Sequence, residues 1–218
     1  MDLALRGKKA IITGATAGLG RAVAELLADE GVDIGFCGKE ADIEATAAGL
    51  RAKGVTAVGA AIDVREGDKF KAWLEQTVAA LSGCDIFIVN TGLDTGLADA
   101  NSWSSNFEID IMHTVRGCET MMPHLKTSGS GAIVILGASG ASVDPAQLSY
   151  SAFQAGLVTY SKQLSQFVGR DSIRVNLVAP APGCGTNAEV ARTVAFLASP
   201  AASLMTGAYV LPGVNAPR

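Results

Sequence analysis

Several features that would assign the chain to a particular class of protein are missing from its sequence. Only 17% of the 218 residues are charged, the formal net charge is −4, and lysine and arginine form no cluster. Nucleic acid is therefore not an expected partner, because binding it needs a basic surface. No run of 18 apolar residues is present, so the sequence also predicts no membrane-spanning helix.

Cysteine is scarce as well. The four cysteines lie far apart, and none belongs to a C-x-x-C pair. This spacing argues against a metal site or a disulfide framework and predicts small buried thiols in a reducing compartment. The N-terminus lacks the apolar core and cleavage site of a secretion signal. We therefore expect a cytoplasmic protein without a metal.

No linker, low-complexity stretch or internal repeat divides the chain, so residues 1–218 are interpreted as one domain. Apolar residues are abundant, at 49%. Apolar runs predict strands at 9–13, 32–37, 55–61, 85–90, 131–137, 172–178 and 207–211. Amphipathic patterns predict helices at 19–30, 40–53, 66–82, 101–126, 149–168 and 187–198. Strands that are apolar on both faces and alternate with helices predict a doubly wound α/β parallel sheet.

A glycine-rich stretch, 13–20, separates the first predicted strand from the first predicted helix. Gly14, Gly18 and Gly20 permit a tight turn and a close approach of the backbone to a ligand. The free N–H groups at a helix N-terminus attract phosphate, so the stretch predicts nucleotide binding. Its spacing is G-x3-G-x-G rather than G-x-G-x-x-G, and an ordinary glycine-rich turn is the alternative.

In such a sheet, ligands bind beyond the carboxyl ends of the strands. The residues to inspect therefore follow each predicted strand, and most of them are small, polar or glycine. They are 14–20, 38–39, 63–64, 90–92, 137–140 and 180–183.

Taken in order, the motifs of the chain resemble the short-chain dehydrogenase/reductase family. The matching segments are 13–20, 63–64, 90–92, 150–152, 173–176 with 178–180, and 196–199 with 206–207. The resemblance covers nearly the whole chain. It implies a Rossmann-like sheet of about seven strands, a nicotinamide cofactor and hydride transfer to or from a carbonyl or alcohol carbon of a small molecule.

The resemblance also implies which residues contact the cofactor. They are Gly14, Thr16, Gly18, Leu19, Gly20, Asp63, Val64, Asn90, Gly92 and Pro180. Among them Asp63 would accept a hydrogen bond from the adenine. An equally favoured interpretation is that Asp63 is the N-cap residue of the helix that follows. Asn90 is expected to hold the backbone beside the cofactor.

The end of the second strand bears on the choice between NADP(H) and NAD(H). In similar proteins an acid at the position of Gly38 selects NAD, and a base at the position of Lys39 suits NADP. Gly38 would leave room for a 2′-phosphate and Lys39 would supply a cation, so the sequence favours NADP(H) over NAD(H). A solvated lysine is the alternative. Asp33, some 20 residues past the fingerprint, lies at the wrong end of the strand.

The catalytic pattern of the family is altered in this chain. Tyr150 is the expected acid/base, but the lysine expected four residues later is Gln154. An amide carries no charge and cannot lower the pKa of the tyrosine as a lysine does. The position of the helper serine falls on Gly137 or Ala138, so Ser139 is the candidate substitute.

A third altered position is Asp110, where the family has an asparagine. Its negative charge would raise the pKa of Tyr150. One interpretation pairs it, as a replacement acid–base pair, with His113, three residues later on the same helical face. The preferred interpretation of His113 is a buried histidine without a catalytic role. The segment that covers the substrate in similar proteins is also missing after 178–183.

These changes leave more than one function open. The first is a weakened oxidoreductase with Tyr150, Ser139, Gln154 and Asp110 in its active site. The second is a degenerate binding or scaffold subunit that forms a hetero-oligomer with an active relative, and the third is non-redox chemistry in an open pocket. The apolar residues of helices 101–126 and 149–168 predict a homodimer or homotetramer, since these helices pair between subunits in similar proteins.

Overall fold

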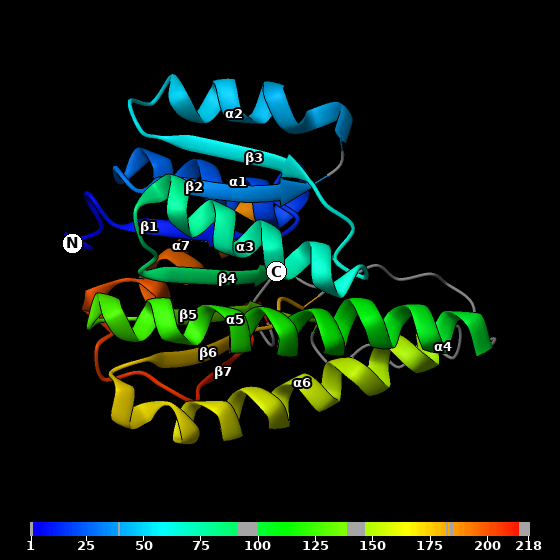
Figure 1. The fold of residues 1–218 in the computed structure, drawn as a ribbon. Coiled ribbons are helices and arrows are strands. Elements are labelled where there is room, and N and C mark those ends of the chain that lie inside the picture. Colours follow the sequence, from blue (N-terminus) through cyan, green and yellow to red (C-terminus); the bar gives the residue numbers. More distant parts are fainter. Residues whose placement is uncertain are drawn as a thin grey trace.

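The computed structural model describes residues 2–38, 40–90, 100–138, 147–181, 183 and 185–213. Seven parallel strands form one sheet in the order β3-β2-β1-β4-β5-β6-β7 (Figure 1). The strands are β1 (Lys9–Ile12), β2 (Asp33–Gly38), β3 (Ala57–Ala61), β4 (Ile86–Asn90), β5 (Ala132–Leu136), β6 (Arg174–Val178) and β7 (Tyr209–Val210). All seven predicted strands are confirmed, although β7 is only two residues long.

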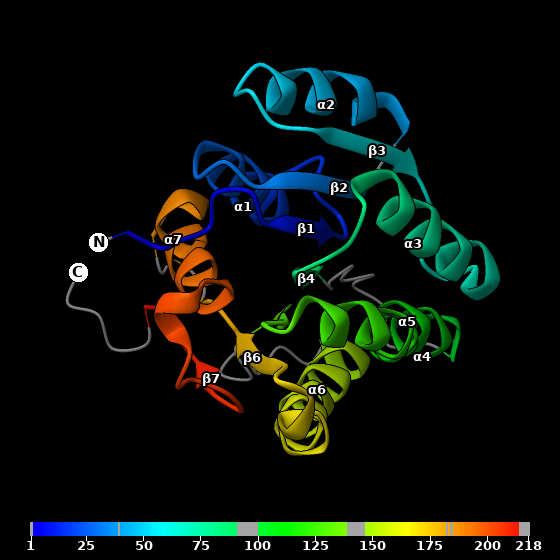
Figure 2. The same cartoon turned by 60° about the vertical axis from the view of Figure 1, so that its left-hand side comes forward.

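Helices cover both faces of this sheet. They are α1 (Gly18–Asp29), α2 (Ile43–Arg51), α3 (Gly67–Leu81), α4 (Ala100–Asn106), α5 (His113–Ser128), α6 (Leu148–Phe167) and α7 (Asn187–Ala198). Helices α1, α2 and α7 pack on one face, and α3, α5 and α6 pack on the other (Figure 2). Within the described residues, no helix is long and apolar enough to cross a membrane.

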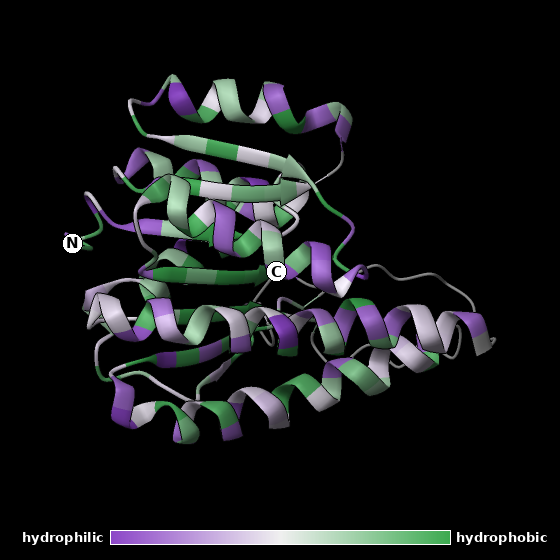
Figure 3. Cartoon of the chain, viewed as in Figure 1, coloured by the Kyte–Doolittle hydropathy of each residue, from purple (hydrophilic) through white to green (hydrophobic). Residues whose placement is uncertain are grey.

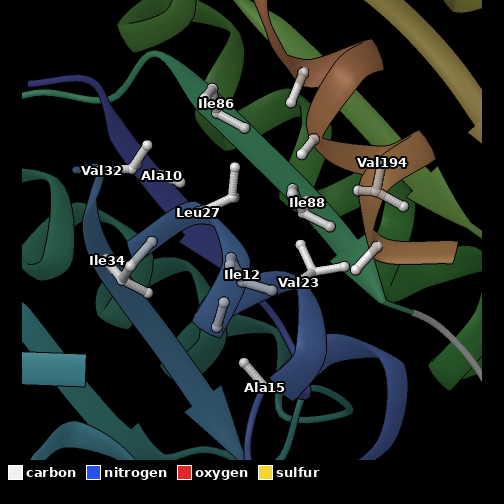
Figure 4. Close-up of a cluster of buried hydrophobic side chains, with 14 of the residues drawn as sticks. Ala10, Ile12, Ala15, Val23, Leu27, Val32, Ile34, Ile86, Ile88 and Val194 are labelled. Carbon is white, nitrogen blue, oxygen red and sulfur yellow. The ribbon is translucent and has the colours of Figure 1, made fainter. Parts of the chain in front are cut away.

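The core is built from strands that are apolar on both sides, as the sequence predicts. Every residue of β5 is buried, and β4 is coloured as hydrophobic over most of its length in Figure 3. On the α1 face, Ile12, Ile34 and Ile88 meet Val23 and Leu27 of α1 (Figure 4). This packing fixes the start of α1 against the ends of β1 and β4.

The predicted helix 101–126 differs in detail from the structure. It is one helical run, but the six residues Phe107–Met112 between α4 and α5 are π-helical, and we call them the π segment. A π segment inserts an extra residue into the helical turn and so changes which side chains face the neighbouring elements. In Figure 1, α4 and the first turns of α6 extend past the carboxyl edge of the sheet.

Candidate functional site

The turn between β1 and α1 lies at the point where the strand order reverses, between β1 and β4. Gly14 and Gly18 have φ angles of +64° and +56°, which L side chains rarely adopt. Ala17 precedes α1 without a side-chain capping bond, so the first N–H groups of this helix are available to an anion. The geometry fits the phosphate-binding role predicted for this stretch.

Asn90, at the end of β4, holds this turn in place. Its side-chain Nδ2 donates to the carbonyl oxygen of Gly14 over 2.9 Å, and its backbone N–H donates to Thr13 Oγ1 over 3.0 Å. A Cβ at Gly20 would overlap the Gly14 carbonyl oxygen and lie 2.7 Å from Asn90 Nδ2. Glycine at position 20 is therefore needed for the close contact between turn, helix and β4.

A cavity of about 510 Å³ opens beside the turn. It is enclosed by the turn, the ends of β2, β3 and β4, and the helical run behind them. Its described lining residues are Thr13, Gly14, Thr16, Ala17, Cys37, Gly38, Ile62, Asp63, Val64, Arg65, Asn90, Ile109 and His113. The structure thus brings several predicted cofactor contacts to one cavity, while Leu19 is half-buried against the core behind the turn.

The carboxylate of Asp63 forms an ion pair with Arg65, whose Nε lies 2.9 Å from Asp63 Oδ1. This contact lowers the pKa of Asp63 below its usual value. The alternative role of Asp63 as a helix N-cap is wrong, because α3 begins at Gly67 and its N-cap residue is Glu66. Arg65 was not singled out from the sequence, which gave no sign that it pairs with Asp63 across a two-residue turn.

The sequence interpretation expected open space beside Gly38, but in the structure the side chain of Thr16 occupies that space. A Cβ on Gly38 would overlap the side chain of Thr16, including its Oγ1 at 2.5 Å. Gly38 therefore allows Thr16 to pack against the end of β2. Three other predicted site residues, Lys39, Gly92 and Ser139, lie outside the described residues.

His113 is fully buried and lines the cavity from the start of α5. Its Nδ1 lies 3.1 Å from the Ile109 carbonyl oxygen and its ring packs edge-on against Phe70, whereas Nε2 has no hydrogen-bond partner among the residues that the structure describes. Burial lowers the pKa of His113 to about 4, so the ring is neutral at pH 7. The Nδ1 contact implies that this nitrogen carries the proton.

Asp110 is also fully buried, but it does not pair with His113. Neither carboxylate oxygen has a hydrogen-bond partner in the described part of the chain. Burial raises the pKa of Asp110 to about 7. The amide of Gln154 opposes this rise as a neighbour, although its Nε2 forms no hydrogen bond with the carboxylate. The acid–base pair of Asp110 and His113, the less favoured interpretation of the sequence, is therefore not formed, and His113 is buried, as the preferred interpretation expected.

Gln154 makes a specific contact at the end of β5. Its Oε1 accepts a hydrogen bond from the Ala138 N–H over 2.9 Å. A Cβ on Gly137 would lie 2.8 Å from the same oxygen. The amide at position 154 thus uses the space that a side chain at position 137 would need.

A second polar contact joins α4 to the first turn of α6, where Asn106 Nδ2 donates to Ser149 Oγ over 2.9 Å. Asn106 Oδ1 has no partner within the described part of the chain. Neither residue was predicted to belong to the site. The spacing of Asn106 and Asp110, four residues on one helical run, was the signal available in the sequence.

The remaining predicted residues lie where their elements place them. Tyr150 is half-buried in the first turn of α6, one turn before Gln154, and is not among the described residues that line the cavity. Pro180 is half-buried just after β6.

The cysteines that the structure describes, Cys37, Cys84 and Cys118, are free and buried, as predicted. Burial raises the pKa of each to about 12. No group of three or more potential metal ligands occurs among the described residues.

Comparison with known proteins gives one consistent family. The sequence model described as short chain dehydrogenase matches residues 8–193. The cis-4-hydroxycyclohexanecarboxylate dehydrogenase of Sinomonas cyclohexanicum is 33% identical over 245 residues, covering 96% of each chain. The 3-oxoacyl-acyl-carrier-protein reductase of Staphylococcus epidermidis is 28% identical over 234 residues, covering 92% of this chain and 95% of the relative.

Solved structures share the fold over almost their whole length. The L-sorbose reductase of Gluconobacter frateurii, in complex with NADPH and L-sorbose, has a TM-score of 0.90 at 25% identity and 97% coverage of both chains. A short chain dehydrogenase of Mycobacterium paratuberculosis bound to NAD has a TM-score of 0.89 at 22% identity, with 96% of this chain and 97% of the other covered.

Proposed function

The chain belongs to the short-chain dehydrogenase family, and we propose that it is an NADP(H)-dependent oxidoreductase acting on a carbonyl or alcohol carbon of a small molecule. The observation that carries this proposal is the glycine turn held by Asn90 beside the 510 Å³ cavity. In this account the bound nicotinamide donates or accepts the hydride. The protein binds and orients the reactants and moves a proton.

The residues present fit a dinucleotide. The free N–H groups at the start of α1 and the turn at Gly14, Gly18 and Gly20 would hold the pyrophosphate. Asp63 and Val64 line the cavity where the adenine would lie. Thr16, Leu19, Asn90, Gly92 and Pro180 complete the proposed contacts.

We assign the preference for NADP(H) to Lys39, with no acid at Gly38 to repel a 2′-phosphate. The L-sorbose reductase, a relative with the same fold, was solved with NADPH. Lys39→Glu should reverse the preference, weakening NADPH binding at least about tenfold by placing a carboxylate beside the phosphate while leaving NADH binding within a few-fold. Equal loss of both cofactors would instead mean that position 39 does not contact the 2′-phosphate.

Tyr150 is the proposed acid/base, with Ser139, Gln154 and Asp110 as its altered helpers. Since Gln154 supplies no positive charge, the pKa of the tyrosine is not lowered as it is by a lysine, and turnover should be slow. General acid–base assistance contributes roughly 10²–10⁴-fold to rate, so partial loss still leaves measurable activity on a reactive substrate.

We also propose that the chain is a shortened member of the family. The alignment with the Staphylococcus epidermidis reductase extends over 234 positions, more than the 218 residues of this chain, so the relative contains residues with no counterpart here. Helix α7 starts soon after β6, with a capping box between Thr186 and Glu189 at its first residue. A missing substrate lid accounts for both observations.

The substitution at Gln154 supports one alternative, a degenerate member that serves as a binding or scaffold subunit, in a hetero-oligomer with an active relative. Non-redox chemistry in the open pocket is the other. For the protein itself we propose a cytoplasmic homodimer or homotetramer.

Turnover assays separate these functions. NADPH oxidation by the purified protein is measured against ketones, aldehydes and quinones, with Tyr150→Phe as the comparison. The proposal expects slow turnover that falls at least about 10²-fold in the variant. A protein that binds NADPH but turns over none of these substrates would be a scaffold or a non-redox enzyme.

A further inference from the structure

One side chain in the wall of the cavity beside the glycine turn carries a buried polar atom without a hydrogen bond. It is His113, the first residue of α5, and the atom is its Nε2. Of the described side chains that line this cavity, His113 alone has such an atom. Leaving a buried nitrogen unpaired costs free energy, so this position favours a ligand that supplies the missing partner.

The hydrogen-bonding character of Nε2 is set within the helix. Nδ1 of the same ring lies 3.1 Å from the Ile109 carbonyl oxygen, which can only accept, so Nδ1 carries the proton. Burial lowers the pKa of His113 to about 4, and the ring is therefore neutral at pH 7. In this state Nε2 is an acceptor. The group that pairs with it must be a donor.

The acceptor that the sequence predicted for the adenine, Asp63, is already engaged. A carboxylate offers about four lone-pair sites. Arg65 makes four contacts with them, in which its backbone N–H and Nε donate to Oδ1 over 3.0 and 2.9 Å, and Nε and Nη2 donate to Oδ2. The Asp63 side chain is also partly exposed, so water can reach it. Asp63 therefore gains less from a ligand donor than Nε2 of His113 does.

Two further acceptors in the cavity wall are paired as well. Thr13 Oγ1 accepts the backbone N–H of Asn90, and the Gly14 carbonyl oxygen accepts Asn90 Nδ2. In the proposed binding mode the adenine lies in this cavity. Its exocyclic amine is a hydrogen-bond donor, whereas the ring nitrogens of the base in a nucleotide are acceptors. The amine therefore matches the acceptor that His113 provides.

Within the proposed dinucleotide binding, on which this inference rests, we infer that Nε2 of His113 accepts a hydrogen bond from the exocyclic amine of the adenine and thereby selects the base. A 6-oxo purine has a carbonyl oxygen at the same place, so two acceptors would face each other without a proton between them. A change of tautomer does not relieve this, because it breaks the bond between Nδ1 and Ile109. His113 thus has a binding role and takes no part in proton transfer.

Fluorescence titration with two reduced dinucleotides tests this inference. One is NADPH, and the other is reduced nicotinamide hypoxanthine dinucleotide phosphate, in which a carbonyl replaces the amine of the adenine. We expect the unmodified protein to bind NADPH at least about tenfold more tightly than the hypoxanthine analogue, because the analogue leaves a buried acceptor unpaired.

Three variants assign this preference to one histidine. His113→Phe keeps a ring beside Phe70 but removes the acceptor, so it should weaken NADPH binding about tenfold and bring the two affinities close together. His113→Gln should bind both dinucleotides within a few-fold of each other, because an amide presents either its oxygen or its N–H group. His124→Gln is the control, since His124 lies on the same helix and contacts Glu75 instead. It should keep the tenfold preference.

Asp63→Asn distinguishes the other candidate acceptor. If His113 reads the base, Asp63→Asn should still prefer NADPH about tenfold, even where loss of the contact with Arg65 weakens both dinucleotides. Loss of the preference in Asp63→Asn, with the preference kept in His113→Phe, would assign the base to Asp63 and overturn the inference.

NMR of the protein labelled with ¹⁵N-histidine observes the contact without any substitution. Nε2 of His113 should give the signal of an unprotonated ring nitrogen, and NADPH should shift this signal upfield as the nitrogen accepts a hydrogen bond. The hypoxanthine analogue should not, and His124 serves as the internal reference. An equal shift with both dinucleotides would mean that a hydroxyl of the ribose, not the amine, pairs with Nε2, and it would overturn the selection of the base.

The outcomes also separate this inference from the function on which it rests. If NADPH gives no saturable binding, the proposed function fails and this inference fails with it. If NADPH binds no more tightly than the analogue, or if His113→Phe keeps the preference, only the assignment of His113 is overturned. Thermal unfolding shows which variants are folded, and if His113→Phe is not, His113→Gln and the nitrogen signal of the unmodified protein decide.

Discussion

At the scale of single residues, Gly137 and Gln154 compete for one volume. The Gln154 Oε1 holds the Ala138 N–H at 2.9 Å, and a Cβ on Gly137 would lie 2.8 Å from that oxygen. Gly137→Ala should therefore displace the amide and break its hydrogen bond, at a cost of about 1–2 kcal/mol in the free energy of unfolding. Urea denaturation measures this change.

The competition is local, so a second substitution should relieve it. Gly137→Ala should lower the free energy of unfolding by about 1 kcal/mol less in a Gln154→Ala background than in the unmodified protein. Gly49→Ala is the control, because a Cβ at Gly49 meets nothing within 4 Å and alanine favours the interior of α2. Additive effects of the two substitutions at positions 137 and 154 would show that they do not share space.

Two buried residues make opposite contributions to the pH dependence of stability. The pKa of Asp110 is raised from 3.8 to about 7. Its contribution to the free energy of unfolding is therefore present below pH 3.8 and is lost as the pH rises to 7. The pKa of His113 is lowered from 6.5 to about 4, so its contribution is present above pH 6.5 and is lost as the pH falls to 4. Between pH 4 and 6.5 the two slopes nearly cancel.

Single variants should reveal each slope. Asp110→Asn should be more stable than the unmodified protein at pH 8, by up to about 4 kcal/mol, and should lose about 3 kcal/mol between pH 6.5 and 4. His113→Gln should instead lose stability as the pH rises from 4 to 7. Urea unfolding at a series of pH values measures both. Parallel pH profiles for the two variants would be incompatible with this assignment.

The sequence was informative about which residues are altered and not about what they contact. Gln154 and Asp110 were identified as departures from the family pattern, at positions where similar proteins have a lysine and an asparagine. That Gln154 turns toward Ala138 depends on the conformation of its side chain and on the missing side chain at Gly137. Such a contact joins residues from different elements, and periodicity does not encode it.

At the scale of elements, the turn between β1 and α1 depends on two glycines for different reasons. Gly18 needs its positive φ, and a Cβ there would meet no atom within 4 Å. Gly20 needs the space beside the Gly14 carbonyl and Asn90. Gly18→Ala should therefore cost about 1 kcal/mol of backbone strain, whereas Gly20→Ala should also move the turn away from β4.

Nucleotide binding should separate the two variants. We expect Gly20→Ala to weaken NADPH binding at least about tenfold, and Gly18→Ala to weaken it less, as measured by fluorescence titration alongside thermal unfolding. Equal losses in binding for the two variants would contradict the packing role of Gly20.

The π segment is the element that the sequence did not predict. The apolar pattern of 101–126 is typical of one continuous helix, and the structure inserts Phe107–Met112 within it. Both Ile109 and Asp110 are buried there, on a run that packs against α6. A local switch of hydrogen-bonding pattern depends on tertiary packing, which leaves no periodic signal in the sequence.

At the scale of the whole molecule, the sheet was the most predictable part. Apolar runs such as those of β4 and β5 can be buried only between two layers of helices, so strand positions and fold class follow from composition and order. The predicted association surface was less reliable. Met121, Leu157 and Leu164 pack in the core against the sheet, whereas Phe167 is 76% exposed.

The proposed oligomer is therefore expected to use the outer faces of α4, the π segment and α6. Each of these elements exposes a large apolar side chain, namely Trp103 in α4, Phe107 in the π segment and Leu148 in α6. Light scattering should give a mass two or four times the 22.2 kDa of the chain. Trp103→Lys combined with Phe107→Lys should reduce the mass to that of a single chain, because burying two charges in the interface is costly. A mass of 22.2 kDa for the unmodified protein would remove the proposal.

The central claim is that the turn held by Asn90 and the cavity beside it bind a nicotinamide dinucleotide, with NADP(H) preferred. The most direct test is a fluorescence titration of the purified protein with NADPH and, separately, NADH. The account predicts saturable binding of NADPH, at least about tenfold tighter than that of NADH, because Lys39 would pair with the 2′-phosphate. Absence of saturable binding by either dinucleotide would contradict it.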